Sequence, residues 1–273
     1  VGLMPTYGRA SLRNVIPLSW TLDHPGPLVR TVRDAAIVLQ AIAGHDRADP
    51  YSHDVSVPDY LAGIERGPKG LRVGVPRQYF WGRNDPAVEA LVRKAIADLE
   101  AAGAEVREVD FTQVEAYFAA FSAIIVTDAA AYHKPMFPSR KDEYGADVAL
   151  LLGLAPGISA ADYAAARHVT AIARAGEADA LLDGIDVLAV PATPIAAPTI
   201  EEAMTPQVAG VLHIYTSIFD VTGQPAISLP CGLTPGGMPA GLMLVARQWD
   251  EATLLRAARA YEMVRGERRS PAL

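Results

Sequence analysis

Residues 71–109, LRVGVPRQYFWGRNDPAVEALVRKAIADLEAAGAEVREV, carry the pattern that decides the fold. The β-branched run at 71–75 reads as a strand, and residues 105–109 read as a second one. Between them, Asp85 and Pro86 start an apolar-periodic helix that Gly103 closes. Two strands joined by a helix form a β-α-β unit, which predicts a right-handed crossover and parallel pairing of the strands.

The same local signals predict the other elements of the chain. Thr31 as an N-cap, Asp34 three positions later and Gly44 at the end predict a helix, and residues 45–70, rich in Asp, Pro and Ser, predict a surface loop. Strands alternating with long helices predict an α/β fold, a mixed β-sheet covered by helices. The remaining predicted helices span 111–132, 159–182 and 250–264, and the remaining predicted strands span 185–190, 226–229 and 242–245.

The composition indicates which class of protein this is and which kinds of partner are excluded. The chain has 273 residues, 51% hydrophobic and 20% charged, which is typical of a soluble globular protein of one large or two small domains. Its net charge of -7 argues against nucleic acid as a partner, because phosphate binding needs clustered cations. The longest apolar runs, such as 149–155, are far shorter than the ~20 residues of a membrane span, so no membrane partner is expected. Cys231 is the only cysteine, which excludes an internal disulfide and favours a reducing cytoplasm.

Motifs for cofactors and metals are missing from the sequence. The turn at Gly74 is not a G-x-G-x-x-G fingerprint, and no phosphate-binding G-x-x-x-x-G-K-[ST] occurs. The six histidines are dispersed, without an H-E-x-x-H pair, and the acidic loop around Asp46, Asp49 and His53 is typical of a solvated turn. We therefore expect no cofactor and no metal ligand.

Nucleophile candidates are weak when judged from the residues alone. Ser19, Asp23 and His24 supply the three residue types of a hydrolase triad, but a triad is defined by geometry in space, so a structural role is the favoured interpretation. Asp23 is expected to pair with Arg30 or to accept from backbone amides. Cys231 lacks a neighbouring activator and is expected to serve packing.

Several longer stretches, in this order along the chain, resemble the amidase-signature enzymes. The resemblance covers essentially all 273 residues and extends to the A subunits of tRNA-dependent amidotransferases, which belong to the same family. The matching stretches are GLMPTYGRASLRNVIPLSWTLDHPGPLVRTVRDAAIVLQAIAGHDRADPYS at 2–52, KGLRVGVPRQYF at 69–80, DAAAYHK at 128–134, IDVLAVPATPIAAP at 185–198, FDVTGQPAISLPCG at 219–232 and PAGLMLVARQWDEATLLRAARAYE at 239–262.

The resemblance implies hydrolysis or transfer of carboxamides by a Ser–cis-Ser–Lys triad with a Gly/Ser-rich oxyanion loop. In the family these groups precede the position that matches Val1, and no serine or lysine of this chain matches a triad position. Residues 1–273 are therefore expected to be the C-terminal portion of a single amidase-signature domain, without catalytic residues and inactive alone. Truncation is the favoured explanation, because Val1 is not an initiator Met. One half of a split enzyme and a non-catalytic binding protein remain open.

The resemblance also implies which residues form the substrate-binding wall opposite the nucleophile. For Thr193 and Pro194 a strand-terminating turn is an equally good interpretation. The implied substrate-binding residues are Tyr132, Thr193, Pro194, Ile195, His213, Ile214, Ser217 and Gln224, with Asp220 nearby.

Two departures from the family pattern bear on the substrate. His213 stands where the A subunits of the amidotransferases carry an acidic residue that engages the amino group of glutamine, and residues 145–157 are apolar where the family often has arginines. Both favour a general amidase for a less polar amide over the A subunit of a glutamyl- or aspartyl-tRNA amidotransferase. The expected partners are a small-molecule amide, the missing N-terminal portion or a chain that supplies it, and further copies of this chain, which would associate through an extended apolar patch.

Overall fold

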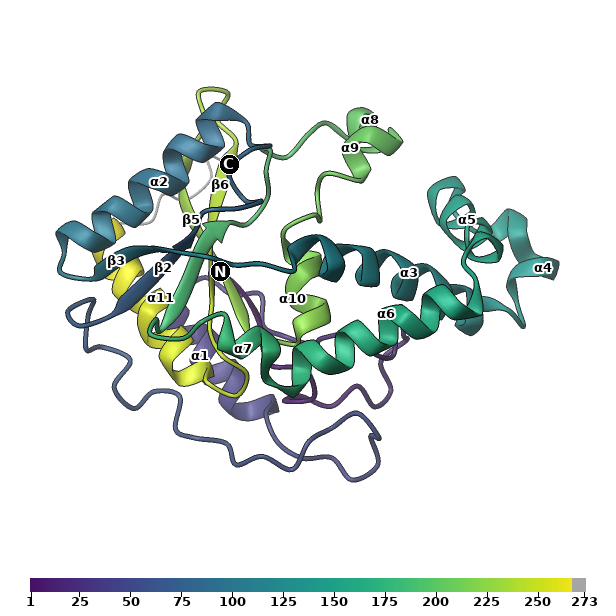
Figure 1. The fold of residues 1–273 in the computed structure, drawn as a ribbon, viewed down its shortest axis with the longest axis horizontal. Coiled ribbons are helices and arrows are strands. Elements are labelled where there is room, and N and C mark those ends of the chain that lie inside the picture. The colour runs from purple at the N-terminus through teal and green to yellow at the C-terminus, as the bar shows by residue number, and fades with distance from the viewer. Residues whose placement is uncertain (267–273) are drawn as a thin grey trace.

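The computed structural model describes residues 1–266, which form a mixed β-sheet with helices on both faces (Figure 1). Within these residues the sheet has six strands in the order β1-β5-β6-β4-β2-β3. The predicted α/β class and mixed sheet are confirmed. The strands are β1 (Gly2–Met4), β2 (Arg72–Pro76), β3 (Glu105–Val109), β4 (Val187–Pro191), β5 (Ala226–Leu233) and β6 (Pro239–Val245).

The β-α-β unit forms where the sequence predicts it. Strands β2 and β3 pair in parallel, with Val73 opposite Val106. Helix α2 (Pro86–Ala101) connects them, with proline in its first turn and the Asp85 carboxylate accepting from the amide of Ala87. Strand β4 pairs in parallel with the other edge of β2, while β4–β6, β6–β5 and β5–β1 are antiparallel pairs.

The helices fall into long elements that pack on the sheet or on each other and short ones in the connections. Helix α1 begins with the predicted capping box, in which Thr31 and Asp34 bond each other's backbone amides. The long helices are α1 (Val32–Ile42), α2, α3 (Val114–His133), α6 (Ala160–Ile172) and α11 (Glu251–Arg265). The shorter ones are α4 (Phe137–Arg140), η1 (Lys141–Glu143), α5 (Ala146–Gly153), η2 (Ala155–Gly157), η3 (Ala173–Glu177), α7 (Ala178–Ala180), α8 (Ile200–Ala203), α9 (Pro206–Ala209) and α10 (Thr216–Thr222).

Alternate residues of the central strands supply two separate cores, as the two-residue period of a strand requires. Val187 and Ala189 of β4 pack in the core formed with α1, α2 and α11. Leu188 and Val190 pack in the second core, formed with α3, α6 and α10. The central strand β4 is therefore buried on both faces, and α3 and α6 lie side by side and extend away from the sheet (Figure 1).

Two predicted boundaries differ from the structure. The helix predicted over 159–182 is interrupted, because α6 ends at Ile172 and Gly176, with φ of 121°, closes a π turn before α7. The strands predicted over 226–229 and 242–245 continue into the segment expected as a turn, and Gly232, with φ of 146°, accommodates a register shift in that hairpin.

Helix α3 is long and apolar enough to cross a membrane by length and composition. Its residues Tyr117, Ala120 and Ile124 are buried in the second core. Of the most apolar 18-residue window of α3, 44% is buried inside the structure.

Candidate functional site

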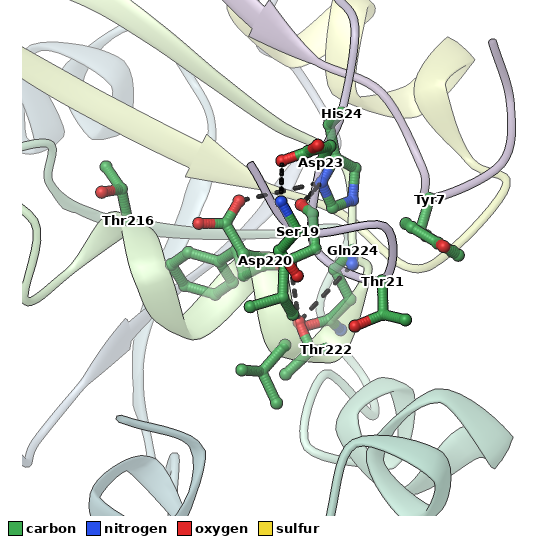
Figure 2. Close-up of polar contacts among 12 residues, drawn as sticks. Tyr7, Ser19, Thr21, Asp23, His24, Thr216, Asp220, Thr222 and Gln224 are labelled. Atoms are coloured by element: carbon green, nitrogen blue, oxygen red, sulfur yellow. Dashed lines mark hydrogen bonds and ion pairs between the residues drawn. The ribbon is translucent and has the colours of Figure 1, made fainter. Parts of the chain in front are cut away.

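Five of the residues that the sequence analysis named lie on helix α10 or directly beside it in the chain. His213 and Ile214 precede α10, Ser217 and Asp220 lie on α10, and Gln224 follows it. The turn after β4 carries the Thr193 to Ile195 segment, and Tyr132 lies near the end of α3. Figure 2 shows that the loop containing Ser19 to His24 reaches the same place from the N-terminal part of the chain.

His24 lies beside Asp220 but does not form a charged pair with it. Its Nδ1 atom contacts the carbonyl oxygen of Leu22 at 2.6 Å, and because a carbonyl only accepts, Nδ1 carries the proton. Burial and the nearby Arg174 charge lower the pKa of His24 to about 3. Nδ1 lies 3.8 Å from the Asp220 carboxylate, so an uncharged ring lies beside this acid (Figure 2).

Asp220 is the unusual acid of this region. Burial raises its pKa to about 7, and while the Arg174 charge opposes this rise, the Asp23 charge adds to it. Within residues 1–266 no donor forms a hydrogen bond with its carboxylate, whose side chain is 27% exposed. Asp220 thus changes charge near neutral pH, unlike an ordinary surface aspartate.

Arg174 joins α10 to the N-terminal loop. Its guanidinium donates to the carbonyl oxygens of Thr21, Asp220 and Val221 at 2.9, 2.7 and 3.0 Å. It also lies 3.9 Å from the ring centroid of Tyr7. Since π turns are frequent at functional sites, its position on the turn after α6 marks this region for attention.

Asp23 and Ser19 have structural roles, as the sequence predicts. The Asp23 carboxylate accepts from the amides of Leu18 and Ser19 at 2.9 and 3.1 Å. The Ser19 hydroxyl donates to Asp128 at 2.6 Å and not to His24. Ser19, Asp23 and His24 therefore do not form a triad.

Asp128 of α3 is a second centre of hydrogen bonding. Besides Ser19, it accepts from the hydroxyls of Thr21 at 3.1 Å and Tyr163 at 2.7 Å. This buried carboxylate joins the N-terminal loop to α3 and α6. Neither Asp128 nor Arg174 was predicted, because a lone acid or arginine within a helix carries no local signal for contacts 35 to 153 residues away.

The wall predicted from the family is well packed. The Thr193 hydroxyl donates to the carbonyl of Ile195 at 2.8 Å, and the Pro194 carbonyl accepts from the Asp85 amide at 2.8 Å, so this segment forms a strand-terminating turn. The His213 ring stacks on Phe118 and lies 5.5 Å from Phe121, and burial lowers its pKa. His213 is therefore uncharged at neutral pH.

The side chains of Ser217 and Gln224 are completely buried. No partner among the described residues bonds the Ser217 hydroxyl, whereas Gln224 donates to the Ala178 carbonyl at 3.1 Å and to Asp179 at 3.0 Å. Ile214 is core, 5% exposed. A substrate role for these three residues stays a prediction.

A cleft of about 510 Å³ opens next to this region, and we call it the aromatic cleft. It contains the predicted Tyr132 together with Trp20 and Tyr51, which the sequence analysis did not single out. Three aromatic residues scattered over two loops and a helix have no periodicity that would reveal a common site. The lining residues are Leu12, Arg13, Val15, Pro17, Trp20, Asp23, Ala48, Asp49, Pro50, Tyr51 and Tyr132.

The acidic loop next to the cleft forms turns, as predicted. Asp46 accepts from the Ala48 amide and Asp49 from the Tyr51 amide, each at 2.9 Å. Over the described range, no three His, Cys, Asp or Glu residues are grouped so that they could hold a metal ion.

Comparisons with known proteins agree with this architecture. The family model described as Amidase matches residues 1–255. An amidase of Pseudomonas putida is 42% identical over 270 residues, which cover 96% of this chain and 58% of that protein. The A subunit of the glutamyl-tRNA(Gln) amidotransferase of Myxococcus xanthus is 38% identical over 287 residues, covering 96% of this chain and 59% of that protein.

Solved structures give the same result. The A subunit of the Thermotoga maritima glutamyl-tRNA(Gln) amidotransferase matches with a TM-score of 0.81 at 27% identity, over 95% of this chain and 57% of that one. A structure from the work on a vestigial complex behind an s-triazine catabolic enzyme matches with a TM-score of 0.86 at 28% identity, over 96% of this chain and 58% of that one. The chain thus spans 57–59% of the length of these four relatives.

Proposed function

Because the chain belongs to the amidase family, we propose that it forms the C-terminal portion of an amidase that hydrolyses carboxamides. In this proposal the nucleophilic serine, the bridging serine, the lysine base and the oxyanion loop lie outside residues 1–273. The described residues then supply the scaffold and one wall of the amide site.

The contacts of Ser19, Ser217 and His24 support the proposal that the groups that attack the amide lie outside this chain. Acyl transfer needs a nucleophile within hydrogen-bond reach of a base. Ser19 instead donates to a carboxylate, and Ser217 is sealed in the core. His24 is neutral and bonded to a backbone carbonyl. We therefore expect no turnover by this chain alone.

The proposed substrate class rests on the surroundings of His213. A neutral ring held between Phe118 and Phe121 presents no anion to a ligand. A site for glutamine would need a negative charge for the substrate's ammonium group. This arrangement favours an amidase for uncharged amides.

The second candidate is the A subunit of a tRNA-dependent amidotransferase. It is favoured by the 38% identity to the Myxococcus xanthus protein, close to the value for the amidase. A non-catalytic binding protein is the third class, and it is the outcome if the complete protein has neither activity.

Ammonia release tests the proposal. The 273-residue chain and the same chain extended by its upstream reading frame are assayed with simple carboxamides and with glutamine. We expect ammonia from uncharged amides with the extended protein and none with the 273-residue chain. The extended protein with His213→Asp is the matched variant, and it should lose activity toward uncharged amides.

Two results would contradict the proposal. The first is turnover by homogeneous 273-residue chain. The second is an extended protein that consumes glutamine only in the presence of tRNA and partner subunits, because this would identify an amidotransferase.

We further propose that this chain is cytoplasmic and contacts another polypeptide, either its N-terminal portion or a second copy. Support comes from exposed apolar side chains near the N-terminus: Leu28 is 89% and Ile16 78% exposed. Sedimentation of the 273-residue chain should show self-association that the extended protein lacks.

A further inference from the structure

The aromatic cleft presents three partly buried rings from three separate segments. Trp20 and Tyr51 lie in loops, and Tyr132 lies near the end of α3. The rings of Trp20 and Tyr132 meet edge to face, with centroids 6.2 Å apart at 76°. Edge and face positions around such a pair are favourable for a further aromatic ring.

Hydrogen bonds join the two segments that carry the Trp20 and Tyr132 rings. Ser19 and Thr21, on either side of Trp20, both donate to Asp128. Asp128 lies one helical turn before Tyr132 on α3, so this buried carboxylate holds the segment that carries Trp20 against the helix that carries Tyr132. The Trp20 carbonyl also accepts from the Tyr7 hydroxyl at 2.7 Å.

The opposite wall of the cleft is held by another buried carboxylate. Asp49 accepts from the amides of Leu12 and Tyr51 at 2.7 and 2.9 Å. Asp49 is 5% exposed, so both loops that line the cleft are tied to the interior. A cleft with such fixed walls binds without the cost of ordering loops.

Polar groups in the cleft match a carboxamide. Within residues 1–266 no hydrogen bond joins the Trp20 indole N–H or the hydroxyls of Tyr51 and Tyr132 to another residue, which leaves donors for a carbonyl oxygen. The Asp23 carboxylate can accept N–H bonds and would repel a carboxylate ligand. The Arg13 guanidinium, 57% exposed, lies 3.8 Å from Asp46 at the rim.

We propose that the aromatic cleft binds the aromatic end of an uncharged arylalkyl carboxamide, packed against Trp20 and Tyr132. The volume of about 510 Å³ suits a small ligand of this kind. This inference rests on the proposed amidase function and names its substrate class.

Binding by the folded 273-residue chain tests the inference without catalysis. Phenylacetamide is titrated by ligand-observed NMR beside acetamide, phenylacetate and benzylammonium. We expect phenylacetamide to bind, with acetamide and phenylacetate at least about tenfold weaker. Trp20→Ala and Tyr132→Leu should each weaken binding by about tenfold.

Trp81→Phe is the matched control, because Trp81 packs under Arg93 outside the cleft and should leave binding unchanged within about twofold. Asp128→Asn keeps the shape of the side chain but weakens the anchor, so an intermediate loss is expected. Far-UV circular dichroism and a cooperative melt establish that each variant is folded.

Three results would overturn the inference: no binding of phenylacetamide at about 10 mM, the limit for a fragment of this size, equal binding by Trp20→Ala, or tighter binding of benzylammonium. Failure of the proposed function is a separate result. Phenylacetamide bound in the cleft but not hydrolysed by the extended protein would contradict the amidase function and leave the cleft as a binding site. Hydrolysis of aliphatic amides by the extended protein, without binding of phenylacetamide, would support the amidase function and contradict the cleft as a binding site.

Discussion

Two charged regions of this protein are organised differently. Arg9 and Glu251 lie 3.3 Å apart, with side chains 1% and 0% exposed, and each makes further hydrogen bonds. The Glu251 carboxylate accepts from the Thr6 amide, and Arg9 donates to two carbonyls at 55 and 56. Asp220 has no hydrogen-bond donor on its carboxylate among residues 1–266, and its nearest ring, His24, is neutral.

This difference indicates that the charged groups of one region stabilise the fold, while those of the other belong to the candidate site. A buried charge that faces an opposite charge and makes further hydrogen bonds stabilises the fold, and removing its partner leaves an expensive uncompensated charge. A carboxylate left with few partners at the edge of a cluster changes its protonation instead. The Arg9 and Glu251 pair therefore belongs to the scaffold, and Asp220 marks the region that meets other groups.

The largest effect should come from breaking the scaffold pair. Glu251→Gln keeps the shape of the side chain but leaves Arg9 buried without a counter-charge, so unfolding free energy should fall by about 3–5 kcal/mol. Urea unfolding followed by circular dichroism measures this. Asp98→Ala, which breaks an exposed pair with Lys94, is the control and should cost less than about 1 kcal/mol. If Glu251→Gln and Asp98→Ala lower the unfolding free energy equally, the buried pair is no more important to the fold than an exposed one.

A smaller and pH-dependent effect is expected at Asp220. Its folded pKa of about 7 lies above the unfolded value, so the folded state binds the extra proton and stability falls as pH rises from about 4 to 7. The groups facing it are Asp23, His24 and Arg174. Asp220→Asn removes the charge and should stabilise the protein at pH 8 by about 1–3 kcal/mol.

Thermal melts of the Asp220→Asn variant and the parent chain at pH 5 and pH 8 give the comparison. At pH 5 the two proteins should melt together, since Asp220 is then protonated. If Asp220→Asn destabilises the protein equally at pH 5 and pH 8, the Asp220 carboxylate makes stabilising contacts and the expectation is wrong.

The smallest effect concerns His213. Burial lowers its pKa, so the unfolded state takes up the proton first and stability is lost as pH falls below about 6.5. Between pH 7 and pH 5, His213 should cost the parent chain less than about 1 kcal/mol of unfolding free energy, because the ring is only half buried. The His213→Phe variant should not show this loss. Chemical unfolding of both proteins at the two pH values detects it. An unchanged pH slope would show that His213 does not contribute.

Local signals in the sequence were sufficient for most of the fold. The capping box at Thr31 and the β2-α2-β3 unit depend on neighbours within a few residues or one connection, so period and capping reveal them. The π turn at Gly176 was missed because an alanine-rich segment continues the helical period across it. Strand β1 was missed since three residues carry too little alternation, and its partner Ile227 lies far along the chain.

The site was predicted only in part, through resemblance and not through pattern. The resemblance named residues on and beside α10, the segment after β4 and Tyr132, but helix α10 itself was not predicted. Trp20 came to light only with the bonds of Ser19 and Thr21 to Asp128, which link residues 109 and 107 positions apart.

The order of the residues alone predicted the α/β fold with its mixed sheet and the family to which the chain belongs. Those properties depend on periodicity, caps and motifs, which are local. Folding in three dimensions settled which charges are compensated, that Asp220 titrates near neutrality, and that three distant aromatic rings share one cleft. The reason is physical: burial and dielectric surroundings depend on every element packed around a group, and no neighbour in the chain reports them.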